Sequence, residues 1–269
     1  DSNIYLNLEQ TSNDDYLKIY KLDSPLIESD TLMHSYLELN AFSNDISLTS
    51  SLEVYEDLTR PDRDRYEFIY PNFNLLKDFG DIKNINGRFS LNSYGYAKTH
   101  NTNIGERIFV NDFVFNSDPK ISKNGFKNSY TYLLKNSNTD SSNSSTFKDG
   151  VDNKFDTIFE YSTSFPLRKQ NETFNTTLNP LMTFKYSPNN SKNMQDDDIR
   201  LDINNIFGFN RLGSSTSVEG GSSFTYGVEY SKSDKLDKEI LGAKIANIFR
   251  PEVDKNLPTK SGLNQKNSD

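Results

Sequence analysis

Hydrophobic and polar residues alternate with a period of two along most of this 269-residue chain. Successive side chains of a β-strand point to opposite faces, so each alternating segment predicts a strand with one apolar and one polar face. No helical pattern of period 3.6 persists for three turns. The segments that we predict as strands are 3–9, 15–22, 31–42, 45–57, 65–78, 87–98, 105–116, 125–136, 152–166, 172–186, 197–211, 218–232 and 238–250.

Many of these segments are unusually long for strands. They reach the roughly 9–11 residues of a tilted strand that crosses a membrane, whereas strands of soluble folds usually have about 5–6 residues. A soluble β-sandwich, as in an adhesin or a carbohydrate-binding module, would show the same alternation. Strand length and polar sides rich in Asn, Ser, Thr and Asp favour an all-β, antiparallel outer-membrane β-barrel segment.

Two segments carry the candidate residues of a water-filled lumen. Their apolar sides, which we expect to face lipid, are Phe174, Leu178, Met182, Phe184 and Tyr186 in 172–186, and Ile199, Leu201 and Ile203 in 197–211. The candidate lumen-facing residues on the opposite sides are Asn175, Thr177, Asn179, Lys185, Arg200, Asp202 and Asn204. Pro180 has no N–H to donate, so we expect a bulge or an unpaired position there.

Composition removes several classes of protein. Aromatic residues make up 13% of the chain, which is unlike a disordered protein, and no run approaches the roughly 18 apolar residues of a membrane helix. The formal net charge of −8 disfavours a nucleic-acid partner. The absence of cysteine excludes disulfides, thiolate metal sites and cysteine nucleophiles within the chain.

Motifs for catalysis, cofactors or metals are not found in the sequence. His34 and His100 lack the spacing partners of a catalytic or metal motif, and we expect a strand-face histidine and a solvated turn. The acidic run Asp196–Asp198 lacks the ligand spacing of an EF-hand, so we interpret it as a solvated loop. We therefore predict that the protein is not an enzyme and has no cofactor.

The second half of the chain resembles the LPS-assembly outer-membrane protein family (LptD, also called OstA or Imp). The resemblance covers about 90 residues, from 178 to 269, and rests on the order and spacing of several short motifs. Residues 1–177 match the family only in strand rhythm. The motifs that carry the resemblance are Leu178–Pro188, Asp202–Gly213, Val218–Gly221, Thr225–Tyr230, Leu241–Arg250 and Ser261–Asp269.

The resemblance implies a function in the outer membrane of a Gram-negative bacterium. The family translocates lipopolysaccharide into the outer leaflet through the polar lumen of a large C-terminal barrel. A lipoprotein (LptE) plugs that barrel, and a periplasmic jelly-roll domain receives lipopolysaccharide from a protein bridge. By this resemblance, residues 1–269 form one internal segment with about half of the barrel strands and no jelly roll. Another outer-membrane barrel, such as a porin or a receptor, remains an alternative.

Two further expectations concern loops and edges. Arg211, Glu219, Gly220 and Gly221 lie at a strand–loop–strand corner, which we interpret as an external loop with an exposed ion pair worth about 0–1 kcal/mol. The start and the polar end of the chain suggest an internal piece of a longer protein. Such a piece has unpaired edges, so we expect a curved, open antiparallel sheet.

Overall fold

The computed structural model describes all residues except 21–28, 62–63, 82–84, 101–102 and 269. It is almost entirely antiparallel β-sheet, with one short α-helix, α1 (Tyr16–Tyr20), and one 3₁₀ turn, η1 (Thr259–Ser261). Within the described ranges, no helix has the length and apolar character needed to cross a membrane. The all-β class predicted from the alternation is confirmed.

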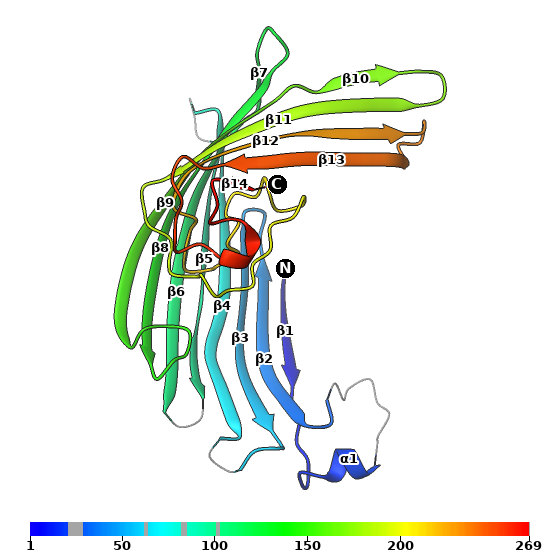
Figure 1. The fold of residues 1–269 in the computed structure, drawn as a ribbon. Helices are drawn as coiled ribbons and strands as arrows, with labels where there is room; N and C mark the ends of the chain where they lie inside the picture. The colour runs from blue at the N-terminus through cyan, green and yellow to red at the C-terminus, as the bar shows by residue number, and fades with distance from the viewer. Residues whose placement is uncertain (21–28, 62–63, 82–84, 101–102, 269) are drawn as a thin grey trace. The chain divides into compact units, whose positions relative to one another are not determined.

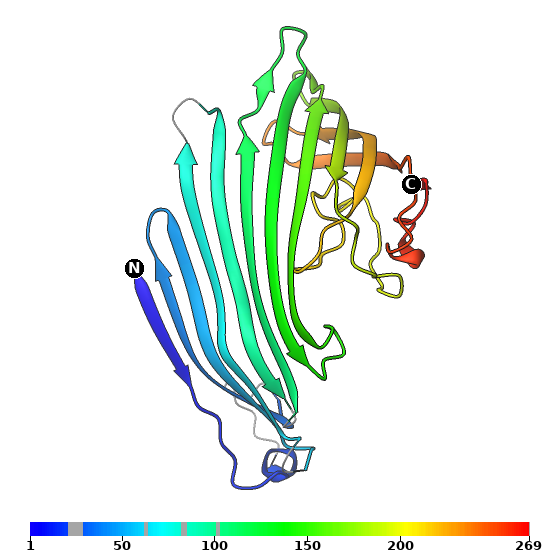
Figure 2. The same ribbon diagram turned by 90° about the vertical axis from the view of Figure 1, so that its left-hand side faces the viewer.

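The strands form one open sheet in which neighbours in sequence are mostly neighbours in space (Figures 1 and 2). The order is β1-β2-β3-β4-β5-β6-β8-β9-β11-β12-β13-β14, while β7 pairs with β8 and β10 with β11. The strands are β1 (Ser2–Asn7), β2 (Leu32–Phe42), β3 (Ile46–Asp57), β4 (Tyr66–Asp81), β5 (Gly87–His100), β6 (Ile104–Ser117), β7 (Lys120–Ile121), β8 (Lys127–Ser142), β9 (Gly150–Ser164), β10 (Leu167–Gln170), β11 (Asn175–Ser187), β12 (Gly221–Ser233), β13 (Glu239–Phe249) and β14 (Asn267–Ser268).

The chain packs into two compact units. The first contains Asp1–Gly80, Ser90–Phe113 and Lys135–Phe155, and the second contains Asp81–Phe89, Val114–Leu134 and Asp156–Asp269. Because all strands of the described residues belong to one sheet, no second sheet packs on it there. A β-sandwich, which needs two stacked sheets, is therefore not what these strands form.

In the first unit, one face of β1–β3 carries a row of exposed leucine side chains. Leu6 lies opposite Leu37, which lies opposite Leu52, and all three are exposed to solvent. The other face of β2 and β3 is polar and internally hydrogen-bonded: Thr49 Oγ1 donates to Asn40 Oδ1 at 2.8 Å. This face also holds His34, whose ring stacks on Tyr55 with 4.1 Å between centroids, which confirms the strand-face histidine.

The second unit shows the same arrangement on β9, β11 and β12. Phe184 lies between Tyr161 and Phe224 on the apolar face, and its side chain is 42% exposed. On the opposite face, Lys185 lies between Glu160 and Ser223 and is only 4% exposed. At these positions of both units, the exposed side chains are therefore apolar and the covered ones are polar.

The strand predicted over 15–22 is wrong. Residues 16–20 form α1 instead, and Leu17 packs with Met33 and Leu58 in a small apolar cluster at the end of β2. Residues 21–22 lie outside the described residues. The alternating pattern does not distinguish a strand from a helix here, because a helix of five residues is too short to show its own period. This short helix buries a single side chain, Leu17.

The strand predicted over 197–211 is also wrong. Residues 188–220 form a folded loop between β11 and β12, and Ile199 and Leu201 pack against a core of loop and strand residues. That core, which we name the loop core, consists of Met194, Ile206, Leu212, Ile248, Leu257 and Leu263. Ile199 and Leu201 thus face protein, whereas Ile203 is 38% exposed. The lipid-facing interpretation of Ile199 and Leu201 does not hold.

Segments 188–220 and 250–266 hold each other by backbone hydrogen bonds and lie side by side (Figure 1). Met194 N donates to Asn256 O at 2.8 Å, and Thr259 N donates to Gln195 O at 3.2 Å. These bonds and the loop core join the two segments into a layer that lies on the sheet. The layer covers the polar face of β11–β13 in the second unit around Lys185, Thr225 and Ile248.

Pro180 interrupts the sheet without changing its register. β9 ends at Ser164 opposite Leu181, and β10 begins at Leu167 opposite Leu178. Phe165 N still donates to Pro180 O at 2.9 Å, but Pro180 has no N–H to return a bond. The expected unpaired position is present, and it separates β9 from β10.

Candidate functional site: the polar face of the sheet and a buried charge cluster

The polar face of β11 carries four of the candidate residues. Asn175, Thr177, Asn179 and Lys185 alternate with the exposed Leu178, Met182, Phe184 and Tyr186, as the period of two predicts. Asn175 Nδ2 donates to Asp237 Oδ1 at 3.4 Å near the end of the strand. Thr177 and Asn179 are partly exposed, whereas Lys185 is buried beneath the loop 188–220.

A cluster of charged side chains lies between this polar face and the loops. Glu219, with only 1% of its surface exposed, accepts hydrogen bonds from Arg211 and Arg250. Arg211 binds both carboxylate oxygens: its Nε donates to Oε2 at 2.6 Å, and its Nη2 donates to Oε1. Lys185 Nζ lies 3.9 Å from the same Oε2. We name Lys185, Arg211, Glu219 and Arg250 the charge cluster.

Hydrogen bonds connect the charge cluster to the strands and loops around it. Arg211 donates to Ser223 Oγ at 2.7 Å and to Thr225 Oγ1 at 3.2 Å, both on β12. Lys185 Nζ donates to Gly208 O at 2.5 Å. Desolvated charges need such additional partners, because ion pairing alone seldom offsets the loss of hydration. The cluster therefore fastens the loop 188–220 to β11 and β12.

The electrostatics of Glu219 follow from its neighbours. Burial raises the pKa of its carboxyl, but the attraction of Lys185, Arg211 and Arg250 is larger, and the net effect lowers the pKa well below its usual range. The carboxylate is therefore ionised throughout the physiological range. Three cations surround one anion here, so Glu219 is the residue on which the local charge balance depends.

The expected exposed ion pair of an external loop is thus a buried one. Arg211 and Glu219 do pair, but both are buried. Glu219 also pairs with Lys185 of β11 and with Arg250, the residue after β13. Gly220 packs against the backbone of 189–191, where an added Cβ would lie 2.3 Å from Asn189 O. Gly221 opens β12 with a φ of 77°, a conformation that favours glycine.

Arg200, Asp202 and Asn204 do not join the other candidates. Asp202 Oδ1 accepts hydrogen bonds from the backbone N of Asn204 at 2.7 Å and Asn205 at 3.0 Å. Arg200 pairs with Asp198 at 3.4 Å and is highly exposed. Asp202 thus organises a turn in the loop 188–220, because its side chain caps local backbone groups instead of lining a strand face.

A second polar group in the first unit was not predicted from the sequence. Lys135, on β8 and 3% exposed, lies 2.6 Å from Asp112 Oδ1 on β6, and its Nζ is 3.1 Å from Tyr94 Oη on β5. Tyr94 and Lys135 lie on the polar sides of their segments, but Asp112 shares its side of 105–116 with Ile108, Val110 and Val114, so alternation gives no signal for it. Three separate strands must align before these positions become one group, so the pattern within each strand does not reveal it.

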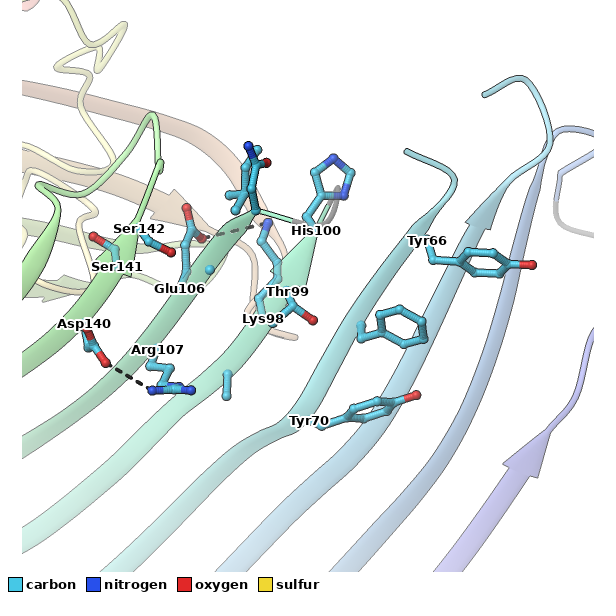
Figure 3. A pocket seen from close by; sticks show the side chains of 15 residues that line it. Tyr66, Tyr70, Lys98, Thr99, His100, Glu106, Arg107, Asp140, Ser141 and Ser142 are labelled. Carbon is cyan, nitrogen blue, oxygen red and sulfur yellow. Dashed lines mark hydrogen bonds and ion pairs between the residues drawn. The ribbon is translucent and has the colours of Figure 1, made fainter. Parts of the chain in front are cut away.

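The same unit contains a hollow of about 880 Å³ near the ends of β4, β5, β6 and β8. Figure 3 shows Tyr66 and Tyr70 on β4 at one side and the ion pair of Arg107 with Asp140, 3.2 Å apart, at the other. His100 also borders it, and its Nδ1 lies 3.3 Å from Glu67. His100 is therefore paired at the end of β5 and does not lie in a solvated turn.

Among the described residues, no group of three or more His, Cys, Asp or Glu side chains could hold a metal ion. No protein-family model and no curated protein matches the chain.

Proposed function

We propose that this chain forms part of the wall of an outer-membrane β-barrel that delivers lipopolysaccharide to the outer leaflet. The observation that carries the proposal is the polarity of the sheet. Met182 and Tyr226 are opposite one another on the open face and are 42% and 45% exposed. Thr183 and Thr225 are opposite one another on the covered face and are at most 6% exposed.

This polarity is unfavourable for a sheet surrounded by water. Burying a Leu- or Phe-sized side chain is worth about 1.5–3 kcal/mol, so a face of uncovered aromatic and aliphatic side chains forfeits that gain at each position. Large exposed apolar surfaces mark sites of interaction with a membrane or another protein. Acyl chains would supply the missing cover along the whole face at once.

Strand length supports the same environment. β4 and β8 each contain 16 residues and β9 contains 15. A strand that crosses a bilayer needs about 9–11 residues, so these strands are long enough to extend beyond the hydrocarbon region.

The lipopolysaccharide cargo follows from the resemblance to the LPS-assembly family and fits the chemistry of the polar face. A charged, sugar-rich head group must keep hydrogen-bond partners while it crosses the membrane. Hydroxyl and amide side chains such as Thr177 and Asn179 donate and accept without a fixed charge. As partners we propose a lipoprotein that plugs the lumen and a periplasmic lipopolysaccharide bridge, which would act through an N-terminal domain.

Depletion of the protein in the bacterium that encodes it tests the cargo. We expect surface lipopolysaccharide to fall while total cellular lipopolysaccharide is retained, because synthesis does not depend on the final transfer. Surface staining of intact cells, compared with staining of lysed cells, measures the ratio. An unchanged ratio with altered permeability to small solutes would instead indicate a porin.

A further inference from the structure

A cavity of about 610 Å³ lies on the polar face of the second unit. Three adjacent strands, β11, β12 and β13 (Figure 1), supply most of its lining, and Ile203 of the loop 188–220 and Pro166 add apolar contacts. A volume of this size lies within the range of known small-molecule sites, about 300–1,000 Å³.

The polar lining is arranged in two rows across the strands. In one row, Thr177 lies opposite Ser231, which lies opposite Gly242. Gly242 has no side chain, and the Glu239 carboxylate lies over it: a Cβ added to Gly242 would be 2.6 Å from Glu239 Oε1. Two hydroxyl groups and one carboxylate therefore border the cavity along this row.

The second row carries the charges. Asn179 lies opposite Glu229, and Glu229 lies opposite Lys244, whose Nζ is 3.2 Å from Glu229 Oε1. Asn179 Oδ1 is buried and accepts no hydrogen bond from the residues that the structure describes. A buried acceptor without a donor is unfavourable, so a ligand hydroxyl that donates to it would be stabilised.

We infer that this cavity is a binding subsite for a neutral sugar unit. Hydroxyl, amide, carboxylate and ammonium groups at close spacing can pair with the many hydroxyls of one sugar ring. Two carboxylates, Glu229 and Glu239, face one ammonium group, Lys244, so a phosphate would be repelled. The inference rests on the proposed function and deepens it, because it assigns the saccharide part of the cargo to named residues.

The absence of tryptophan from the chain makes a direct binding assay possible. Ile203→Trp places one fluorophore beside the cavity, and Leu236→Trp, on the highly exposed loop between β12 and β13, is the matched control. Each variant, folded in detergent, is titrated with maltotetraose and, separately, with inorganic phosphate. We expect a saturable change in emission for Ile203→Trp with maltotetraose alone.

Variants of the polar rows test the assignment of residues. Asn179→Leu in the Ile203→Trp background is expected to weaken maltotetraose binding about tenfold, the effect of losing one good hydrogen bond. In the chain without a reporter, maltotetraose should raise the thermal unfolding midpoint, and Asn179→Leu should abolish that rise. This second measurement is independent of whether Ile203→Trp folds.

Several results would overturn the inference. Equal responses of Ile203→Trp and Leu236→Trp, equal affinity for phosphate, or no response together with no thermal shift each exclude a neutral-sugar site here. Vesicle insertion is measured in parallel. Insertion without sugar binding removes the subsite alone, whereas sugar binding by a chain that stays in the aqueous phase removes the membrane proposal and leaves the subsite.

Discussion

Glu219 is the residue whose replacement should matter most in the second unit. Glu219→Gln keeps the size of the side chain but leaves Lys185, Arg211 and Arg250 without their shared anion. Removing one partner of a buried ion pair costs about 3–5 kcal/mol. We expect a loss of that size in urea unfolding of the detergent-folded protein. Glu172→Gln, at an exposed position, is the control and should leave stability nearly unchanged.

The contribution of Glu219 to stability should also depend on pH. The folded-state pKa of Glu219 is lowered, so its contribution is complete above its ordinary value of 4.5 and is lost as pH falls toward the depressed value. We therefore expect the difference in unfolding free energy between the wild type and Glu219→Gln to stay constant from neutral pH to about pH 5. Below about pH 4 the difference should shrink. A difference that already disappears near pH 6 would contradict the assignment.

The importance of this cluster could be predicted from the sequence only in part. Arg211 and Glu219 are eight residues apart, so a local ion pair was foreseeable. Their burial depends on Lys185 and Arg250, which are distant in sequence and reach Glu219 only after β11, β12 and β13 have paired. The pattern within a segment carries no information on such long-range assembly.

At the scale of elements, period-two alternation predicts most of the long strands, because each strand belongs to a sheet whose two faces differ in chemistry. It fails at 15–22 and 197–211 for a shared reason. In both segments the apolar residues pack against loop or strand-end residues, Leu17 on Met33 and Ile199 on the loop core. Alternation shows that every second residue is apolar, but it does not show whether lipid, a loop or another strand covers that residue.

A pair of arginine substitutions on β11 tests which face of this strand contacts lipid. Met182→Arg places a charge on the open apolar face and should destabilise the membrane-folded protein by about 2–4 kcal/mol if it lies near the midplane. Thr177→Arg, on the polar face of the same strand, should cost much less. Urea unfolding in lipid vesicles measures both. Equal costs would refute the assignment of faces.

A substitution at Gly220 tests how the loop 188–220 packs. A Cβ at this position would lie 2.3 Å from Asn189 O and 2.9 Å from Ser191 N, both of them backbone atoms. Gly220→Ala should therefore displace the loop, at a cost of about 1–3 kcal/mol, and increase its cleavage by protease. Gly105→Ala is a control for added bulk, because its backbone is not left-handed and its Cβ would meet only the rotatable side-chain Oγ of Ser142, at 3.1 Å. Similar protection of the loop in both variants would contradict the packing.

At the scale of the whole molecule, the proposal predicts a single repeating signal along the strands. The chain has no cysteine, so single cysteines introduced along β11 and β12 give unique sites for a nitroxide label. In lipid vesicles, labels at Met182, Phe184 and Tyr226 should collide mainly with oxygen dissolved in the bilayer. Labels at Thr177, Asn179 and Ser231 should collide mainly with a water-soluble nickel chelate, because their face is polar.

The phase of this alternation distinguishes three environments that the open face could have: acyl chains, a protein partner or water. Acyl chains against the open face give oxygen and nickel accessibilities that alternate with opposite phase and a period of two. A protein partner covering that face would instead protect its labels from both reagents. A sheet in water would let nickel reach the open face most freely. Either of the last two patterns would remove the membrane wall, and lipopolysaccharide delivery through it would then lose its physical basis.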